Sequence, residues 1–102
     1  MPARILWSPR ATLRLTELGD FIAVRSPAAA RKTVQKILDA VARLADHPLL
    51  GSSWTTDTSG FVRRLVVGPY LVYYEIDELG RVLVLTVRHG RERSPEIEDV
   101  RE

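Results

Sequence analysis

Hydrophobic residues recur at helical spacing in two stretches of the first half of the chain. In the first stretch they stand three or four positions apart, at Ala11, Leu15, Leu18 and Ile22. The second stretch continues this spacing at Ala30, Val34, Ile37, Val41 and Leu44. Each stretch follows a Ser-Pro pair, at Ser8-Pro9 and Ser26-Pro27, which supplies an N-cap and a proline for the first helical position. The pattern predicts helices over residues 9–24 and 27–46 that form a helical hairpin.

The second half of the chain is typical of strands. Val, Leu and Tyr dominate residues 61–67, 70–77 and 82–88, which Gly68-Pro69 and residues 77–81 separate. Links this short predict antiparallel hairpins, because parallel neighbours need a longer crossover. We also expect an edge strand at 3–7, a loop at 48–60 and at most a short acidic helix after Ser94-Pro95. The predicted fold class is α+β, with an N-terminal strand and helical hairpin packed on a small antiparallel sheet.

Alternation along the predicted strands indicates two apolar faces. On residues 70–77, one face carries Val72, Tyr74 and Ile76, and the other carries Leu71 and Tyr73. We expect the helical hairpin to cover one face, and the C-terminal tail or a partner chain to cover the other. The residues expected to be largely buried are Ala11, Leu15, Leu18, Ile22, Val34, Ile37, Val41, Leu65, Val72 and Val84.

Composition narrows the class of protein. With 102 residues, 45% of them hydrophobic and 27% charged, the chain fits one domain over 1–102 with a short acidic tail at about 94–102. The absence of cysteine excludes disulfides and thiolate metal sites, and two histidines argue against a catalytic metal centre. No apolar run is long enough to span a membrane or to form a signal peptide, so we expect a cytoplasmic protein without a membrane partner.

Charge is distributed unevenly around the small net value of +2. Residues 1–45 carry eight basic and three acidic side chains, whereas residues 94–102 carry one basic and four acidic side chains. Thirteen of the fifteen basic residues are arginine, whose planar fork suits phosphates and carboxylates. A basic helical half is compatible with a polyanionic or acidic partner.

No common enzyme motif is present, and the remaining chemical signal is a group of basic residues near the strand ends. Arg63-Arg64 lie in the first of the three strands, and residues 88–93 (Arg-His-Gly-Arg-Glu-Arg) leave the last one. Arg63 could instead pair with Glu75 or Asp77 across the hairpin. The tryptophans and tyrosines most simply serve packing: these are Trp7, Trp54, Tyr70, Tyr73 and Tyr74. Arg88 and Arg93 most simply lie on the surface.

Several segments in order resemble the RelE/ParE family of bacterial toxins. They are Trp7-Ser8 with Ala11, Ser26-Pro27 with Ala30, His47-Pro48 with Gly51, Arg64-Leu65, the run 70–74 (Tyr-Leu-Val-Tyr-Tyr), and the ending 87–91 (Val-Arg-His-Gly-Arg). The resemblance covers nearly the whole chain and implies a helical hairpin packed on a small antiparallel sheet. It also implies a growth-inhibiting toxin, of a kind linked to plasmid stabilisation, that a cognate antitoxin neutralises by binding.

The family resemblance leaves two targets open. RelE-type members cut mRNA on the ribosome with basic residues plus a Tyr or His, whereas ParE-type members inhibit DNA gyrase. Arg64 and Arg91 match two basic positions of the RelE-type site, and His89 is then the one credible acid–base group, because arginine stays protonated. Leu71 and Ile97, however, stand where nucleases of the family often have Arg and Tyr. We therefore expect a ParE-like gyrase inhibitor, with the ribosome-dependent endoribonuclease as the alternative. No cofactor, metal or small-molecule substrate is expected.

Overall fold

Two long helices form as the apolar pattern predicts. In the computed structural model, which describes residues 2–54 and 61–101, α1 spans Pro9–Ala23 and α2 spans Pro27–Ala42. The hydroxyl oxygens of Ser8 and Ser26 accept hydrogen bonds from the backbone N–H groups of Ala11 (3.0 Å) and Ala29 (3.1 Å). Both predicted N-caps are therefore confirmed. A 3-10 turn, η1 (Arg43–Ala45), carries the second helix to the predicted end of the helical region.

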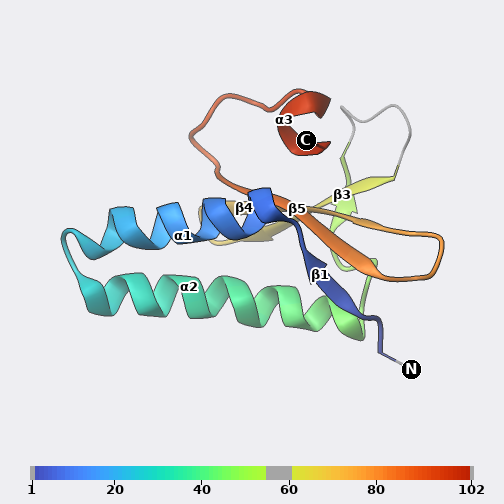
Figure 1. The fold of residues 1–102 in the computed structure, drawn as a ribbon, viewed down its shortest axis with the longest axis horizontal. Coiled ribbons are helices and arrows are strands. Elements are labelled where there is room, and N and C mark those ends of the chain that lie inside the picture. The colour runs from blue at the N-terminus through green and yellow to red at the C-terminus, as the bar shows by residue number, and fades with distance from the viewer. Residues whose placement is uncertain (1, 55–60, 102) are drawn as a thin grey trace.

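The sheet has five strands in the order β1-β5-β4-β3-β2 (Figure 1). Its strands are β1 (Ile5–Trp7), β2 (Ser52–Ser53), β3 (Val62–Val67), β4 (Tyr70–Ile76) and β5 (Val82–His89). β3, β4 and β5 pair antiparallel, as predicted, and β2 adds antiparallel to β3. β1 joins the edge of β5 in parallel, so the sheet is mixed. β2 lies inside the predicted loop, whose residues 55–60 are outside the described part of the chain.

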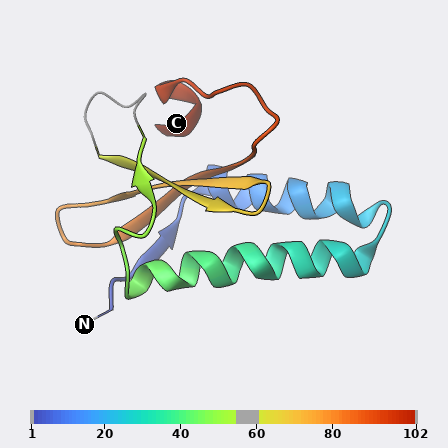
Figure 2. The same cartoon turned by 180° about the vertical axis from the view of Figure 1, so that it is seen from behind.

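The helical hairpin covers one face of the sheet (Figure 2). The main hydrophobic core lies between these two layers, and seven of its members are Ala11, Ile37, Val41, Leu65, Val72, Tyr74 and Val84. The predicted burial is thus confirmed for six residues, all of these except Tyr74, which was not among the ten. Gly19 allows close packing of the helices, because a Cβ there would lie 3.2 Å from the Cγ2 of Val34.

Four residues expected to be largely buried are only partly so: Leu15, Leu18, Ile22 and Val34. The hairpin is longer than the sheet that it covers, and its turn projects beyond the strands (Figure 1). Leu15 and Leu18 still pack against the main hydrophobic core from its margin, whereas Ile22 and Val34 do not belong to it. The amphipathic stripe correctly predicts the two helices, but it gives no information on the length of the sheet that they cover.

The C-terminal tail covers the other face of the sheet. The short helix α3 (Ile97–Arg101) lies on the side away from the helical hairpin (Figure 1). Val100 is buried there with Trp54, Val62 and Tyr73, and Ile97, Leu71 and Leu85 pack around them. The Arg10 guanidinium in α1 donates to the carbonyl oxygens of Glu98 and Asp99, and Arg101 forms an ion pair with Glu75 at 2.9 Å. The expectation of a cover on the second face is confirmed, with the tail as that cover.

A β-bulge in β5 changes which side chains share a face. Tyr73 pairs with Thr86 and Tyr74 pairs with Val84, so Leu85 is the extra residue. Val82 and Val84 belong to the core under the helices, and after the bulge it is Val87 that returns to that core. Alternation along β5 is therefore inverted after Leu85.

Arg63 has a different partner from the one expected. Its Nε and Nη2 donate to the carbonyl oxygen of Gly51 at 3.0 and 2.6 Å, so the predicted pairing with Glu75 or Asp77 is wrong. Arg63 lies opposite Tyr74, on the face of the helices, whereas Glu75 lies opposite Val62. The two carboxylates bind other arginines, since Glu75 pairs with Arg101 and Asp77 pairs with Arg81.

Tyr74→Phe and Tyr73→Phe are expected to change stability in different ways. The Tyr74 hydroxyl donates to the carbonyl oxygen of Pro48 (2.7 Å) and accepts from the N–H of Gly51 (2.9 Å). Its removal leaves both groups without that partner and should cost about 1–3 kcal/mol of unfolding free energy. The buried Tyr73 hydroxyl has no hydrogen-bond partner among the residues that the structure describes. Its removal should be neutral or stabilising by about 1 kcal/mol. Urea unfolding measures both, and equal losses would contradict this account.

Candidate functional site

Arg64 lies on the face of the sheet that the tail covers. Its cross-strand partner is Tyr73, which belongs to the cluster under α3, and cross-strand partners present their side chains to the same face. The Arg64 side chain is half-buried. Within residues 2–54 and 61–101 it forms no hydrogen bond or ion pair, so it is an available cation on this face.

His89 lies on the opposite face. It is the last residue of β5 and pairs with Tyr70, which packs against the core under the helices. The two rings meet edge to face with their centroids 5.3 Å apart. The Nδ1 of His89 accepts a hydrogen bond from the backbone N–H of Arg91 at 3.0 Å. That bond leaves Nε2 as the nitrogen that can carry the proton of a neutral ring.

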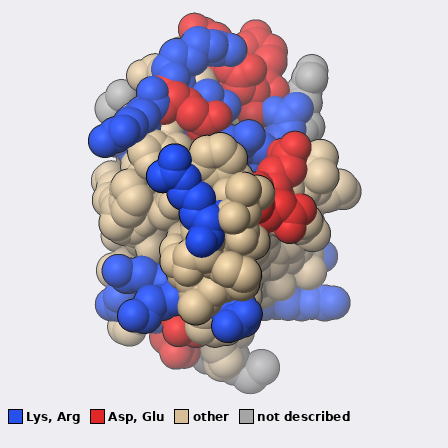
Figure 3. Space-filling model, turned by 90° about the vertical axis from the view of Figure 1, so that its left-hand side faces the viewer, with Lys and Arg blue, Asp and Glu red and all other residues tan. Residues whose placement is uncertain are grey.

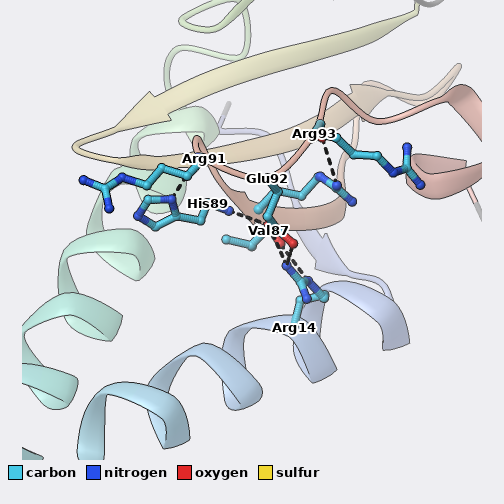
Figure 4. Close-up of polar contacts among 7 residues, drawn as sticks. Arg14, Val87, His89, Arg91, Glu92 and Arg93 are labelled. Carbon is cyan, nitrogen blue, oxygen red and sulfur yellow. Dashed lines mark hydrogen bonds and ion pairs between the residues drawn. The ribbon is translucent and has the colours of Figure 1, made fainter. Parts of the chain in front are cut away.

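Arg91 occupies the turn directly after β5. Its side chain is exposed and extends away from α1 beside the ring of His89 (Figure 4). In the described part of the chain its guanidinium has no hydrogen bond or ion pair. The structure therefore brings His89 and Arg91 together and leaves Arg64 on the other face of the sheet.

Leu71 and Ile97 both pack against the second hydrophobic cluster. Leu71 lies beside Val66 of β3, and Ile97 begins α3. Their apolar character is explained by this packing, since each helps to bury Tyr73 and Val100. Neither position offers a proton donor, a proton acceptor or a cation.

The turn after β5 is fastened to α1 by an ion pair that the sequence did not reveal. Both carboxylate oxygens of Glu92 accept from Nη2 of Arg14, at 2.9 and 2.8 Å, and Arg14 Nε donates to the carbonyl oxygen of Val87 at 3.1 Å (Figure 4). The backbone N–H of His89 also donates to Glu92, at 2.7 Å. Arg14 and Glu92 are 78 positions apart in the chain. In the sequence, Arg14 is distinguished only by its position outside the apolar stripe of its helix.

These contacts set the charge state of Glu92. Partial burial raises the pKa of its carboxyl, but the N–H of His89 and the charges of Arg14 and Arg88 outweigh burial and hold the pKa below its ordinary value of 4.5. Glu92 is therefore ionised at neutral pH and balances the charge of Arg14.

A cleft of about 520 Å³ opens between α1 and this end of the sheet. Its apolar walls come from Leu18, Phe21, Ile22 and Tyr70. His89, Glu17 and the Arg14–Glu92 pair supply its polar rim. Phe21 is 83% exposed, so the cleft presents an aromatic surface to an incoming partner.

Residues 2–54 and 61–101 contain neither a metal-binding cluster nor a membrane-spanning helix. No three His, Asp or Glu side chains there lie close enough together to hold a metal ion. No helix in that part of the chain is long and apolar enough to cross a membrane.

Comparison with known proteins identifies the family to which the chain belongs. The family model for the ParE toxin of type II toxin–antitoxin systems matches residues 5–94. The chain belongs to this family. It is thus a toxin of a type II toxin–antitoxin system, within the broader RelE/ParE group that its sequence resembles.

Individual relatives agree with this assignment. The toxin is 35% identical over 96 residues to a candidate toxin, Y4kP of Sinorhizobium fredii, with 92% of this chain and 95% of the relative covered. It is 32% identical over 88 residues to toxin RelE2 of Caulobacter vibrioides, covering 86% and 96% of the two chains.

Solved structures share the fold. A chain of the chromosomal ParDE toxin–antitoxin system from P. aeruginosa matches with a TM-score of 0.72 at 21% identity, over 85% of this toxin and 95% of that chain. A chain of the RelBE2 toxin–antitoxin complex from Mycobacterium tuberculosis matches with a TM-score of 0.62 at 22% identity, over 87% and 99%. The predicted α+β toxin fold is confirmed.

Replacing Arg14 with Gln is expected to raise the pKa of Glu92 toward 4.5. In the wild type, the lowered pKa means that ionised Glu92 stabilises the folded state above pH 4.5, and that this contribution is lost as the pH falls through the pKa of the folded state. An NMR titration of the Glu92 carboxyl carbon measures the shift, and unfolding free energies below pH 4.5 measure its consequence. Identical titration curves for the two proteins would contradict the assigned role of Arg14.

Proposed function

We propose that this toxin inhibits growth by acting on DNA gyrase and that a cognate antitoxin neutralises it by binding. The observation that carries the choice of target is the separation of Arg64 from His89. These two groups, which an RNA-cleaving site would need at one phosphate, lie on opposite faces of the sheet.

Cleavage of RNA makes strict geometric demands. A base must reach the 2′-hydroxyl, an acid must reach the leaving oxygen, and cations must contact the phosphate, each at hydrogen-bonding distance. Arginine cannot serve as the base, and His89, the acid–base group of the candidate set, lies on the face of the sheet opposite to Arg64. Leu71 and Ile97 add no such group, because both belong to the apolar cluster under the tail. This arrangement supports a toxin that acts by binding rather than by cutting.

A ribosome-dependent endoribonuclease is the alternative. It is favoured by the name of the 32% identical relative, toxin RelE2, and by the adjacency of His89 and Arg91 in one turn. In that case mRNA would lie across the turn after β5, with His89 as the acid–base group and Arg91 on the phosphate.

An antitoxin partner is supported by two observations. The solved structures that share this fold come from toxin–antitoxin systems. The end of the helical hairpin also carries a largely uncharged surface, which one basic side chain crosses, with acidic side chains on one side and basic ones below (Figure 3). Phe21 and Val24, at 83% and 87% exposure, contribute to it and line an apolar groove with Ile22 and Ala29. Exposed apolar side chains of this size are typical of a docking surface for a partner segment.

The target is tested with one preparation of antitoxin-free toxin in two assays. Supercoiling of relaxed plasmid DNA by purified gyrase should be inhibited, and ribosomes loaded with mRNA should show no toxin-dependent cuts. Arg64→Ala and His89→Ala should leave gyrase inhibition within about threefold of the wild type. Loss of an acid–base group in a nuclease would instead cost about 10²–10⁴-fold in cleavage. Codon-site cleavage without an effect on gyrase would reverse the assignment.

The antitoxin surface is tested by a matched pair of charge insertions. Val24→Glu places a charge in the apolar groove and should weaken binding of the co-expressed protein from the adjacent reading frame by about tenfold or more. Leu79→Glu is the control, because Leu79 is similarly exposed (77%) but lies in the turn between β4 and β5. Isothermal titration measures both affinities. Equal effects of the two substitutions would contradict this location, and no association at micromolar concentration would remove the antitoxin assignment itself.

A further inference from the structure

The tail cover, residues 94–101, lies on the second face of the sheet through few buried side chains. Val100 and Pro95 are buried, whereas the other residues of this segment are half-buried or exposed. Residues 90–96, which connect β5 to α3 and are all described by the structure, contain no helix or strand and loop away from the sheet (Figure 2). The tail cover is therefore a short segment on an irregular connection.

Asp99 is the point at which the tail cover is fastened. Its carboxylate accepts a hydrogen bond from the backbone N–H of Glu96 at 2.9 Å and forms an ion pair with Arg93 at 3.2 Å. The first of these bonds caps the start of α3. The carbonyl oxygen of Asp99 accepts from the Arg10 guanidinium, which ties α3 to α1. The Glu96 N–H and the charge of Arg93 hold the pKa of the Asp99 carboxyl below its ordinary value of 3.8, so the group is ionised at neutral pH.

The ion pairs of the tail cover are weak. The side chains of Arg93 and Asp99 are 70% and 32% exposed, and those of Arg101 and Glu75 are 35% and 18% exposed. Ion pairs that water reaches contribute little to stability. A segment with few buried apolar contacts and solvent-accessible polar contacts opens at a lower free energy than the whole fold.

The surface beneath the tail cover carries two polar groups that closure leaves unpaired. Tyr73 is fully buried, and its hydroxyl has no hydrogen-bond partner among the described residues. Burial of an unpaired hydroxyl is unfavourable, because the group loses its hydration. Arg64 pairs with Tyr73 across the strands and is half-buried, without a hydrogen bond or ion pair in the same part of the chain. Opening hydrates both groups, so both favour the open form.

We propose that the tail cover opens and closes as a unit while the helices and the sheet stay folded, and that Asp99 is the residue that holds it closed. Opening uncovers Tyr73 and Arg64 beside the ring of Trp54, whose centroid lies 5.2 Å from that of Tyr73. The closed form is then autoinhibitory for this face, because access to it is limited to the open fraction of the toxin. The inference does not depend on whether gyrase or the ribosome is the target.

Cysteine labelling measures the opening directly, because the chain has no cysteine of its own. Val100→Cys places a buried thiol in the tail cover, and Thr86→Cys places one on the sheet beneath it, opposite Tyr73. Val72→Cys is the matched control, buried in the core under the helices. In the folded full-length toxin, a water-soluble thiol reagent should modify the first two variants at similar rates, about 100-fold or more faster than Val72→Cys, which requires global unfolding. Labelling in urea corrects for intrinsic thiol reactivity, and thermal unfolding corrects for differences in global stability.

The role of Asp99 is tested in the Thr86→Cys background. Asp99→Ala should raise the labelling rate by about tenfold, because the cap of α3 and the ion pair are both lost. Glu98→Ala removes the neighbouring, exposed carboxylate of the same helix and should leave the rate within about twofold. Arg10→Gln should act in the same direction as Asp99→Ala and provides a second variant in case that one folds poorly. Tyr73→Phe should lower the rate by about fivefold, because closure then buries no unpaired hydroxyl.

Three results would overturn the proposal. Equal labelling rates at Thr86→Cys and Val72→Cys would mean that the tail cover leaves only when the whole fold opens. Fast labelling of Val100→Cys alone would mean that the last residues fray without uncovering the sheet. Equal effects of Asp99→Ala and Glu98→Ala would remove the role of Asp99. Because no gyrase or ribosome assay enters these measurements, failure of this proposal is distinguishable from failure of the proposed function.

Discussion

Burial of both faces of β4 is the constraint on which the rest of the structure depends. Tyr73 and Tyr74 are adjacent in sequence, point to opposite faces and are both fully buried. One hydrophobic layer cannot cover both rings, so the sheet needs a cover on each side. The helical hairpin supplies one and the C-terminal tail supplies the other. With both faces occupied, polar side chains are available for binding chiefly where the strands end.

This constraint explains where the candidate functional residues lie. His89 and Arg91 stand at the end of β5, where the sheet stops and the cleft beside α1 opens. The start of α1 also closes the edge of β5 beyond β1, since Ser8 Oγ donates to the carbonyl oxygen of Leu85 (2.9 Å) and Arg14 Nε donates to that of Val87. Arg14 therefore both occupies an edge carbonyl of the sheet and fixes the turn that follows it.

Local sequence signals predict the helices and the main strands well, but they do not predict contacts between residues that are distant in the chain. The Ser-Pro helix starts and the apolar stripes define α1 and α2 because capping and amphipathic spacing act over a few residues. The parallel partner of β1, the acceptor of Arg63 and the Arg14–Glu92 pair all join segments that are distant in the chain. Each of these contacts depends on which polar groups the packed layers bring together, and the spacing of residues along the chain does not predict this. The candidate residues were likewise chosen by type and resemblance, without knowledge of the faces on which they lie.

The face of His89 depends on a single extra residue. With unbroken alternation from Val84, residues 85, 87 and 89 would all face the tail, and His89 would share that face with Arg64. The bulge at Leu85 inverts the alternation, so that Val87 enters the core under the helices and His89 follows it to the same side. Arg88, opposite Leu71, takes the tail side instead. A change of one residue in strand register thus separates an acid–base group from a cation while the same residues remain in the sequence. In this fold, matching residue types at matching positions therefore do not by themselves establish a nuclease site, and the strand register has to be known as well.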